Sequence, residues 1–306
     1  MKNLAYVILM MLFSCKTSLE KGKNSFSFMV IGDWGWVTST EQAKTANIMK
    51  SVADTIKIDY LVSTGDNFYY NGVQSIDDSK WTERYENMYN GSLLGKDWYV
   101  TLGNHDYEGN VQAQLDYNTK NSQWKLPKRY YTVEKTLQSF PRITLLMVFL
   151  DTSPFDKNLH TSGVHTDVTQ QDTTLQKKWL DSTLANSKAQ WKMVFGHHPL
   201  YTAGPRKGTM GNYIATFKPI FDKYKVDFYV AGHEHHLGHL KPDNNHTEYV
   251  VSGGGGADIT PISNYDVSKY TASTYGFTLF KVDNQKITFT FINNKGEKLY
   301  EYTKTK

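Results

Sequence analysis

The chain has 306 residues, of which 39% are hydrophobic and 21% are charged. These proportions allow a large buried core, and they exclude an intrinsically disordered chain, a collagen and a coiled coil. Its 34 Lys and Arg residues and 30 Asp and Glu residues are scattered along the sequence and leave a net charge of +4. A dedicated nucleic-acid binder needs a clustered basic face, so we expect no nucleic acid among the partners.

The first 14 residues have the pattern of an export signal. A lysine precedes an apolar run from Leu4 to Phe13, which is too short to span a bilayer but matches a signal-peptide core. Cys15, the single cysteine, ends a Leu-Phe-Ser-Cys sequence that resembles a bacterial lipoprotein box. We therefore expect an exported lipoprotein in the periplasm or at the cell surface, cleaved before Cys15, lipidated there and tethered by residues 15–25. The alternative is an ordinary cleaved signal and a secreted protein.

Between residues 26 and 231, apolar runs of strand length alternate with stretches of helix length. This alternation predicts parallel strands joined by helices. The expected strands are 26–31, 59–64, 97–102, 130–133, 143–150, 191–195 and 227–231, and the expected helices are 40–57, 79–89, 170–184 and 214–224. No linker or repeat interrupts residues 26–306, so we expect a single domain there.

After residue 247 the sequence carries strand patterns without helices. The expected strands are 248–252, 275–282, 286–292 and 298–302, and they predict an antiparallel meander that completes a second sheet. The run Gly253–Gly256 lacks the lysine and helix that follow a nucleotide-binding loop, so we expect a tight turn near a site instead.

Five of the predicted strands end in a polar motif that begins with glycine. The motifs are GDWG at 32–35, GDNFYY at 65–70, GNHD at 103–106, GHHP at 196–199 and GHEHH at 232–236. Any one of them could be an ordinary polar turn. Ligands bind at the carboxyl ends of strands in open α/β sheets, so the five motifs together predict one shared pocket.

The five motifs offer seven side chains that bind metal ions: Asp33, Asp66, Tyr69, Asn104, His197, His233 and His235. One ion needs about four to six donors, so seven donors with one shared carboxylate predict two neighbouring ions. Imidazole and oxygen ligands suit iron, zinc and manganese. Two such ions activate water and stabilise the entering and leaving oxygens of a displacement at phosphorus, which predicts phosphoester hydrolysis.

In this order, and together with matching stretches between residues 147 and 199, the motifs resemble the purple acid phosphatases among the calcineurin-like metallophosphoesterases. The chain length resembles the mammalian-type, tartrate-resistant branch. The wider superfamily usually places a histidine two residues after the first aspartate, whereas this chain has Gly35 there and Tyr69 in the second motif, as purple acid phosphatases do. The resemblance covers nearly the whole mature chain. It implies an α/β fold, a four-layer αββα sandwich of two mixed sheets, as the catalytic domain over residues 26–306.

The resemblance also implies a role for each site residue. Fe(III) would be held by Asp33, Asp66, Tyr69 and His235, and a divalent ion, Fe(II), Zn or Mn, by Asp66, Asn104, His197 and His233. His105 matches the histidine that contacts phosphate and assists the leaving group, and Asp106 is expected to orient it or a neighbouring ligand. Arg206 stands where relatives of the mammalian type have a second histidine. We expect it to bind phosphate oxygens, with a solvated surface arginine as the alternative.

We therefore expect a monomeric metal-dependent acid phosphatase that hydrolyses small phosphate monoesters with a metal-bound hydroxide. Fe(III) strongly lowers the pKa of bound water, which predicts an acidic optimum. A phosphodiesterase or nucleotidase with the same centre is the first alternative, because pocket loops choose the ester. A surface binding protein with a retired metal site is the second, although such a protein would have lost a ligand.

We expect the loop 153–172 to cover the site, with His160 and His165 exposed on it. No role is assigned to His198, His236 or His239.

Overall fold

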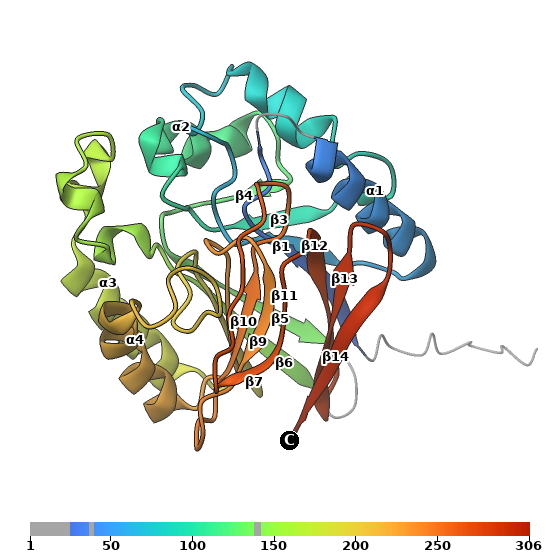
Figure 1. Ribbon diagram of the computed structural model, residues 1–306, viewed down its shortest axis with the longest axis vertical. Coiled ribbons are helices and arrows are strands. Elements are labelled where there is room, and N and C mark those ends of the chain that lie inside the picture. The colour runs from blue at the N-terminus through green and yellow to red at the C-terminus, as the bar shows by residue number, and fades with distance from the viewer. Residues whose placement is uncertain (1–24, 37–39, 138–141) are drawn as a thin grey trace, which may run out of the picture.

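The computed structural model describes residues 25–36, 40–137 and 142–306. Two mixed sheets of seven strands each face one another, and helices cover their outer faces (Figure 1). This arrangement confirms the expected α/β sandwich. The expected signal peptide and Cys15 lie outside the described residues.

The first sheet has the strand order β14-β13-β12-β1-β2-β3-β4. Its parallel half contains β1 (Phe26–Ile31), β2 (Tyr60–Ser63), β3 (Asp97–Val100) and β4 (Trp124–Lys125). Its antiparallel half contains β12 (Gly276–Val282), β13 (Lys286–Asn293) and β14 (Lys298–Thr305), and it joins the parallel half through the pairing of β12 with β1.

The second sheet has the strand order β11-β9-β10-β8-β7-β6-β5. Four parallel strands form its centre: β6 (Ile143–Phe149), β7 (Trp191–Phe195), β8 (Phe228–Ala231) and β10 (Glu248–Ser252). The antiparallel strands at its edges are β5 (Tyr131–Leu137), β9 (Leu237–Leu240) and β11 (Ser268–Ala272).

The expectation that the strands after residue 247 complete the second sheet together was wrong. Strand β10 lies in the second sheet, parallel to β8, whereas β12, β13 and β14 extend the first sheet. All six residues of β1 are buried, so this strand needs neighbours on both edges, and β12 supplies the second neighbour. The rings of Phe28 and Phe280 stack across this pairing at 5.1 Å.

Helix α1 (Thr40–Thr55) covers the first sheet, and α3 (Thr173–Asn186) and α4 (Gly211–Tyr224) cover the second (Figure 1). A short helix α2 (Val111–Asp116) was not expected. The helix expected over residues 79–89 is one π-helical segment, Trp81–Glu86, in which the N–H of Asn87 donates to the carbonyl of Thr82. Short 3₁₀ segments occupy Gly91–Leu93, Asp106–Glu108, Tyr117–Thr119, Ser153–Phe155, Leu159–Thr161 and Thr166–Gln170.

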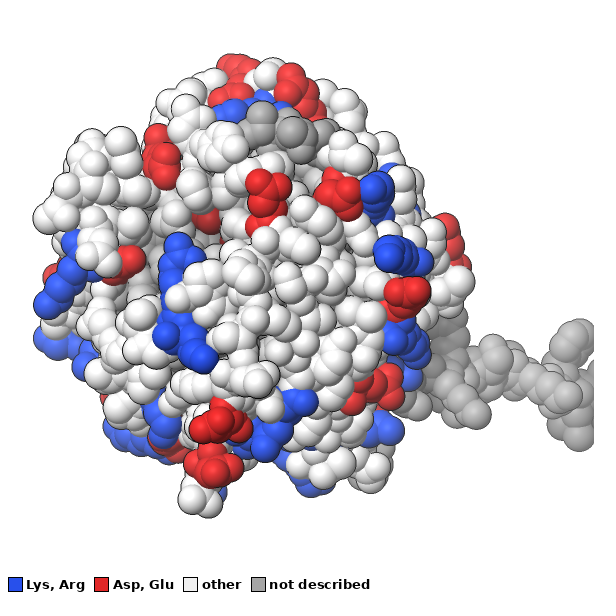
Figure 2. Space-filling view, in the orientation of Figure 1, with Lys and Arg blue, Asp and Glu red and all other residues white. Residues whose placement is uncertain are grey.

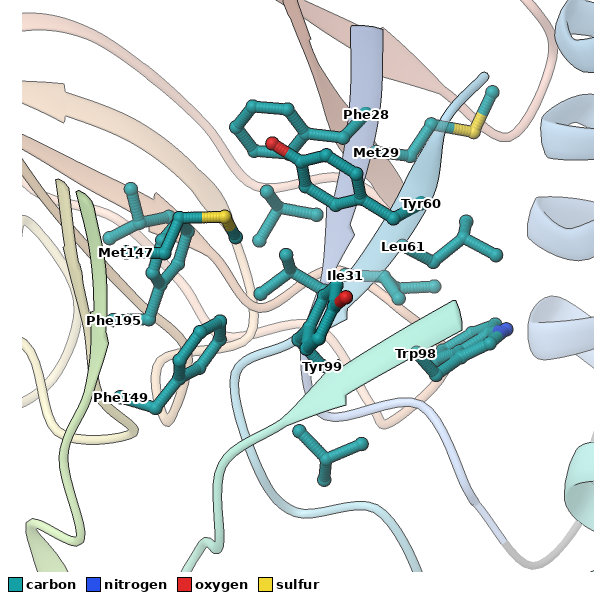
Figure 3. Packing of buried hydrophobic residues seen from close by; sticks show 14 of the residues in the cluster. Phe28, Met29, Ile31, Tyr60, Leu61, Trp98, Tyr99, Met147, Phe149 and Phe195 are labelled. Atoms are coloured by element: carbon teal, nitrogen blue, oxygen red, sulfur yellow. The ribbon is translucent and has the colours of Figure 1, made fainter. Parts of the chain in front are cut away.

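Large apolar side chains fill the space between the sheets. They include Phe28, Tyr60 and Tyr99 from the first sheet and Met147, Phe149 and Phe195 from the second (Figure 3). Because successive strand residues point to opposite faces, Met29 and Trp98 point the other way, toward the helix-covered side (Figure 3). This packing holds the ends of both sheets in place, where the candidate site lies.

Lys and Arg side chains are interspersed with Asp and Glu side chains on the face of the molecule that Figure 2 shows. On the side of the molecule shown in Figure 2, basic and acidic side chains surround a largely uncharged centre. Within the described ranges, no helix has the length and hydrophobicity needed to cross a membrane.

Candidate metal centre

The seven ligand candidates come together at one end of the two facing sheets. Asp33 follows β1, Asp66 and Tyr69 follow β2, Asn104 follows β3, His197 follows β7, and His233 and His235 follow β8. The carboxyl ends of strands from both sheets therefore meet at a single place.

Three of these side chains surround the hydroxyl of a fourth, Tyr69. Its Oη lies 3.2 Å from Oδ1 of Asp33, 3.0 Å from Oδ2 of Asp66 and 3.1 Å from Nε2 of His235. We call Asp33, Asp66, Tyr69 and His235 the tyrosine cluster.

A second group gathers around the ring of His197. Its Nε2 lies 3.1 Å from Oδ1 of Asn104, 3.1 Å from Nδ1 of His233 and 3.4 Å from Oδ2 of Asp66. We call Asp66, Asn104, His197 and His233 the histidine cluster. The same oxygen of Asp66 belongs to both clusters.

The two clusters bring together more acceptor atoms than the protons of their own side chains can satisfy. Bound cations would satisfy the remaining acceptors. A phenol has one proton, but three acceptor atoms surround the Tyr69 hydroxyl. His197 directs Nδ1 to the carbonyl of Thr64 at 2.9 Å, so Nδ1 carries a proton, and in the neutral ring Nε2 would point a lone pair at Oδ1 of Asn104 and Oδ2 of Asp66. His235 does the same with Nδ1 against the carbonyl of Asp258 at 2.7 Å. Metal–ligand bonds of about 2.0–2.2 Å would bring such acceptors to the spacing found here.

The loops that carry the ligands adopt unusual backbone conformations. Asp33, Asp66 and His233 have φ angles of 58°, 50° and 68°, in the left-handed region that non-glycine residues seldom occupy. Hydrogen bonds hold them there, because the N–H of His233 donates to both carboxylate oxygens of Asp33 and the N–H of His105 donates to Asp66 Oδ1 at 2.9 Å. Such strained positions cluster at functional sites.

The glycine run after β10 closes tightly on the site, as expected. A Cβ atom on Gly253 would lie 2.3 Å from the carbonyl oxygen of Glu234 and 2.8 Å from Oδ2 of Asp33. Only a residue without a side chain fits at this position.

Burial and mutual charge shift the protonation of the acidic ligands. Burial raises the pKa of Asp33 well above its usual range, and the charge of Asp66 adds to this shift. Burial also raises the pKa of Asp66, but attraction to His197 and His105 outweighs it and leaves the pKa far below the usual range. Burial, followed by the charges of Asp66 and Asp33, raises the pKa of the Tyr69 phenol. A bound cation would lower the raised pKa values of Asp33 and Tyr69, because it stabilises their anionic forms.

His105 lies beside the tyrosine cluster with its ring held by neighbours. The ring centroid is 4.5 Å from that of Tyr69, and Nδ1 lies 2.7 Å from the carbonyl oxygen of Tyr70 and 3.1 Å from Oε1 of Glu108. Nδ1 is therefore the donor to Tyr70, and Nε2 is left for a substrate. His165 was expected to be exposed but is buried, with Nε2 at 3.4 Å from the same oxygen of Glu108, while His160 is exposed as expected.

Arg206 is anchored by a buried carboxylate. Its backbone N–H and its Nη1 each lie 3.2 Å from Oε1 of Glu234, whose side chain is fully buried. Arg206 lines a cavity of about 340 Å³ together with His233 of the histidine cluster. The neighbouring Lys207 turns away and donates to the carbonyl of Asn264 at 2.8 Å.

Asp106 and two of the histidines without an expected role differ in their hydrogen-bond partners. Asp106 accepts from the N–H of Gly103 at 2.8 Å and from that of Asn67 at 3.1 Å, so it joins two ligand loops. His236 is buried, and neither ring nitrogen has a hydrogen-bond partner among the described residues. His239 lies in a buried network, 3.1 Å from Oε2 of Glu248.

Comparisons with known proteins agree with this geometry. A family model described as calcineurin-like phosphoesterase matches residues 26–237, and one described as iron/zinc purple acid phosphatase-like protein C matches residues 247–301. Purple acid phosphatase 3 of Arabidopsis thaliana is 33% identical over 94% of this chain and 79% of its own length. Tartrate-resistant acid phosphatase type 5 of Homo sapiens is 29% identical over 90% of this chain and 89% of its own length.

Solved structures share the fold at lower identity. GAP50, the anchor in the inner membrane complex of Plasmodium, has a TM-score of 0.81 and 24% identity, and the match covers 92% of this chain and 89% of that one. Purple acid phosphatase PPD1 from yellow lupin (Lupinus luteus) seeds has a TM-score of 0.66 and 16% identity, with 92% of this chain and 53% of that chain covered.

Proposed function

Since the chain belongs to the calcineurin-like phosphoesterases and, within them, to the purple acid phosphatases, it is a metal-dependent acid phosphatase, and we propose that its seven convergent side chains hold the two metal ions. The observation that carries this proposal is the shared oxygen of Asp66, which lies 3.0 Å from Tyr69 Oη and 3.4 Å from His197 Nε2. One carboxylate thus belongs to both clusters, as a ligand that bridges two ions would.

We assign Fe(III) to the tyrosine cluster and a divalent ion to the histidine cluster. The tyrosine cluster offers two carboxylates and a phenol, and anionic oxygen ligands suit a hard, highly charged cation. The histidine cluster offers two imidazoles and an amide besides the shared carboxylate, which suits Fe(II), Zn(II) or Mn(II). When bound, such a pair of ions polarises a phosphoryl oxygen and lowers the pKa of nearby water.

His105 would transfer a proton to the leaving oxygen of a phosphate monoester. The bond from Nδ1 to the carbonyl of Tyr70 holds the ring in place and leaves Nε2 for the ester. Oε1 of Glu108 lies 3.1 Å from the same Nδ1 and helps to fix the ring. His105 thus acts beside the metal clusters without being a ligand in either of them.

Arg206 would bind phosphate oxygens at the other side of the site. Glu234 holds one guanidinium nitrogen, and the side chain is 47% exposed in a cavity that it shares with His233. The remaining N–H groups of a planar guanidinium can donate two parallel hydrogen bonds to a phosphate. An arginine does not release its proton in the useful pH range, so its role is binding rather than acid catalysis.

The metal assignment is tested by colour and metal content together. Purified protein is expected to contain two metal ions per chain, one of them iron, and to absorb visible light through charge transfer from Tyr69 to Fe(III). Tyr69→Phe is expected to lose this band, whereas the control Tyr70→Phe, which changes an exposed neighbouring ring, is expected to keep it. An unchanged spectrum in Tyr69→Phe contradicts the assignment.

The phosphatase activity is tested with p-nitrophenyl phosphate and with bis(p-nitrophenyl) phosphate over a range of pH. We expect the monoester to be cleaved faster, with an optimum below pH 7, because a ferric ion held by the tyrosine cluster would lower the pKa of nearby water. A faster reaction with the diester would favour the phosphodiesterase alternative.

We also propose that the protein is exported and anchored by lipid on Cys15. The support comes from the sequence, in which an apolar run of signal-peptide length precedes a lipoprotein-like box and the single cysteine. Metabolic labelling with palmitate is expected to mark the wild type and not Cys15→Ser. An unlabelled, freely soluble wild type contradicts the anchor.

A further inference from the structure

The carboxylate of Glu108 lies between two histidines that come from separate parts of the chain. Its Oε1 lies 3.1 Å from Nδ1 of His105 and 3.4 Å from Nε2 of His165. Glu108 ends the 3₁₀ segment that directly follows His105, and His165 directly precedes the 3₁₀ segment Thr166–Gln170. A single oxygen atom therefore connects the loop 153–172 with the histidine proposed to act on the leaving group.

His165 presents an N–H group to this oxygen. The residue is 7% exposed, and burial lowers the pKa of its imidazole, which favours the neutral ring. A neutral imidazole has one proton, and this proton belongs on Nε2, because a lone pair there would face the carboxylate oxygen of Glu108. The hydroxyl of Ser162, 2.5 Å from Nδ1, is then placed to donate to Nδ1.

The carboxylate of Glu108 is the acceptor that the N–H of His165 needs. Nε2 of His165 is buried and forms no hydrogen bond of ordinary geometry with any residue in the described ranges. A buried donor without an acceptor is costly, so this N–H attracts the neighbouring carboxylate. The side chain of Glu108 is 23% exposed and is thus held between the two rings.

A second link fastens the same loop to the same 3₁₀ segment. Arg129 pairs with Asp167 of the loop, and its Nη1 donates to the hydroxyl of Tyr107 at 2.8 Å. Tyr107 is buried and directly precedes Glu108 in the chain. The position of His165 beside Glu108 is therefore fixed by the fold and does not depend on their own contact alone.

The contact with Glu108 bears on the direction of the His105 ring. Nδ1 of His105 faces two acceptors, the carbonyl oxygen of Tyr70 at 2.7 Å and Oε1 of Glu108 at 3.1 Å. Two acceptors restrict the rotation of the ring more than one does, and so they set where Nε2 points. Proton transfer needs a donor within about 2.6–3.2 Å of the leaving oxygen, so this direction matters for turnover.

We propose that His165 is a positioning residue, which holds the carboxylate of Glu108 and through it directs Nε2 of His105 toward the leaving oxygen. The loop 153–172 would thereby determine how well alkyl phosphates are hydrolysed relative to aryl phosphates. An alkyl ester needs a proton on its leaving oxygen, whereas the stable anion of a nitrophenol leaves without one. This inference rests on the proposed function, because it takes His105 as the acid.

The test compares kcat for ethyl phosphate with kcat for p-nitrophenyl phosphate. Their ratio reports protonation of the leaving oxygen, because ethanol is a far weaker acid than p-nitrophenol. His165→Phe keeps a ring and removes its nitrogens, and we expect it to lower the ratio about tenfold. His165→Gln, whose amide can still donate to Glu108, is expected to keep most of the ratio. A merely structural defect would lower both kcat values alike and leave the ratio unchanged.

His160→Phe is the matched control, because it changes an exposed histidine of the same loop whose Nε2 lies 2.8 Å from the carbonyl oxygen of Pro154. Its ratio should equal that of the wild type. Glu108→Ala tests the route, since it should lower the ratio by the same factor as His165→Phe. In the double variant, His165→Phe should then lower the ratio no further.

Proton NMR reads the ring without turnover. In protein loaded with Zn(II), which is diamagnetic, the Nδ1 proton of His105 is identified by its absence in His105→Ala. We expect this proton to exchange with water about tenfold faster in His165→Phe and in Glu108→Ala than in the wild type.

An unchanged ratio or an unchanged exchange rate in a His165→Phe protein with the wild-type melting temperature would overturn the proposal. If His165→Phe melts below the assay temperature, the same two results in Glu108→Ala decide in its place. Absence of hydrolysis in every sample would contradict the proposed function alone, because the exchange rate still reports whether His165 holds the ring of His105.

Discussion

Replacing Gly103 with alanine is expected to disrupt both metal clusters through one added methyl group. A Cβ at this position would lie 2.1 Å from Oδ1 of Asp66 and 2.3 Å from the backbone nitrogen of Asp66. Nonbonded contacts need about 3.5 Å, so the carboxylate has to move by about 1 Å or more. Metal–ligand distances tolerate only about 0.2 Å. Because Asp66 belongs to both clusters, we expect Gly103→Ala to lose both ions.

The expected loss of turnover is about 100-fold or more, the cost of misplacing a reacting group by about 1 Å. Overpacking is expected to lower the free energy of unfolding by about 1–3 kcal/mol. Gly211→Ala is the matched control, because no atom lies within 4 Å of its Cβ position at the start of α4. Elemental analysis, p-nitrophenyl phosphate turnover and thermal melting are measured on the same samples. A Gly103→Ala protein with two ions and wild-type turnover would refute the shared role of Asp66.

Three further predictions follow from neighbouring contacts. His105→Ala should lower kcat about 100-fold or more with metal content unchanged, because the N–H that binds Asp66 belongs to the backbone; loss of metal would contradict this role. Arg206→Lys should raise KM for p-nitrophenyl phosphate about tenfold, because an ammonium group cannot donate in parallel to Glu234 and to phosphate. Saturation kinetics with an unchanged KM would contradict the phosphate-binding role of Arg206. Burial acts to raise the pKa of Glu248, but His239, Lys241 and Lys304 lower it from 4.5 to about 2. The ionised carboxylate of Glu248 should contribute on the order of 3 kcal/mol to the free energy of unfolding. This contribution should be present above pH 4.5 and be lost as the pH falls through about 2. The melting temperatures of Glu248→Gln and of the wild type should therefore converge in acid.

Most of the strands, and the convergence of the ligand candidates on one place, could be predicted because local sequence marks both. A buried parallel strand is a short apolar run, and the residue that follows it lies at the carboxyl end of the sheet. The glycines that open the five motifs therefore mark where each strand stops. Metal-binding side chains directly after these glycines predicted one site before any pairing of strands was known.

The partition of the strands between the sheets could not be predicted from local pattern. Strands β10 and β12 both have the sequence pattern of apolar strands near the end of the chain, yet they lie in different sheets. What separates them is pairing over long distances in sequence, such as Phe26 with Val282. Alternation of apolar residues gives the face of a strand but not its neighbour.

The hydrogen bonding of His198 and Tyr213 could not be predicted, for a different reason. Both residues are buried, and neither Nε2 of His198 nor the hydroxyl of Tyr213 has a hydrogen-bond partner among the described residues. In sequence, Tyr213 is one aromatic residue on an amphipathic helix, where a core position is the usual outcome. His198 follows a ligand, and its direction depends on the hydroxyl of Thr152, which lies 46 positions earlier in the chain. Only the hydrogen bonds of the folded chain reveal that both side chains have such a polar atom.

The division of the proposed ligands between the sheets ties the tyrosine cluster and the histidine cluster to the core. Loops of the first sheet supply the carboxylates, the phenol and the amide, and loops of the second sheet supply the three imidazoles. Each cluster therefore needs both sheets, and the distance between the sheets sets the distance between donors. Side chains such as Phe28 and Phe195, whose ring centroids are 6.4 Å apart, fix the separation of the sheets. A core substitution that shifts one sheet by more than about 0.2 Å exceeds the tolerance of metal–ligand bonds, so packing between the sheets constrains function as well as stability.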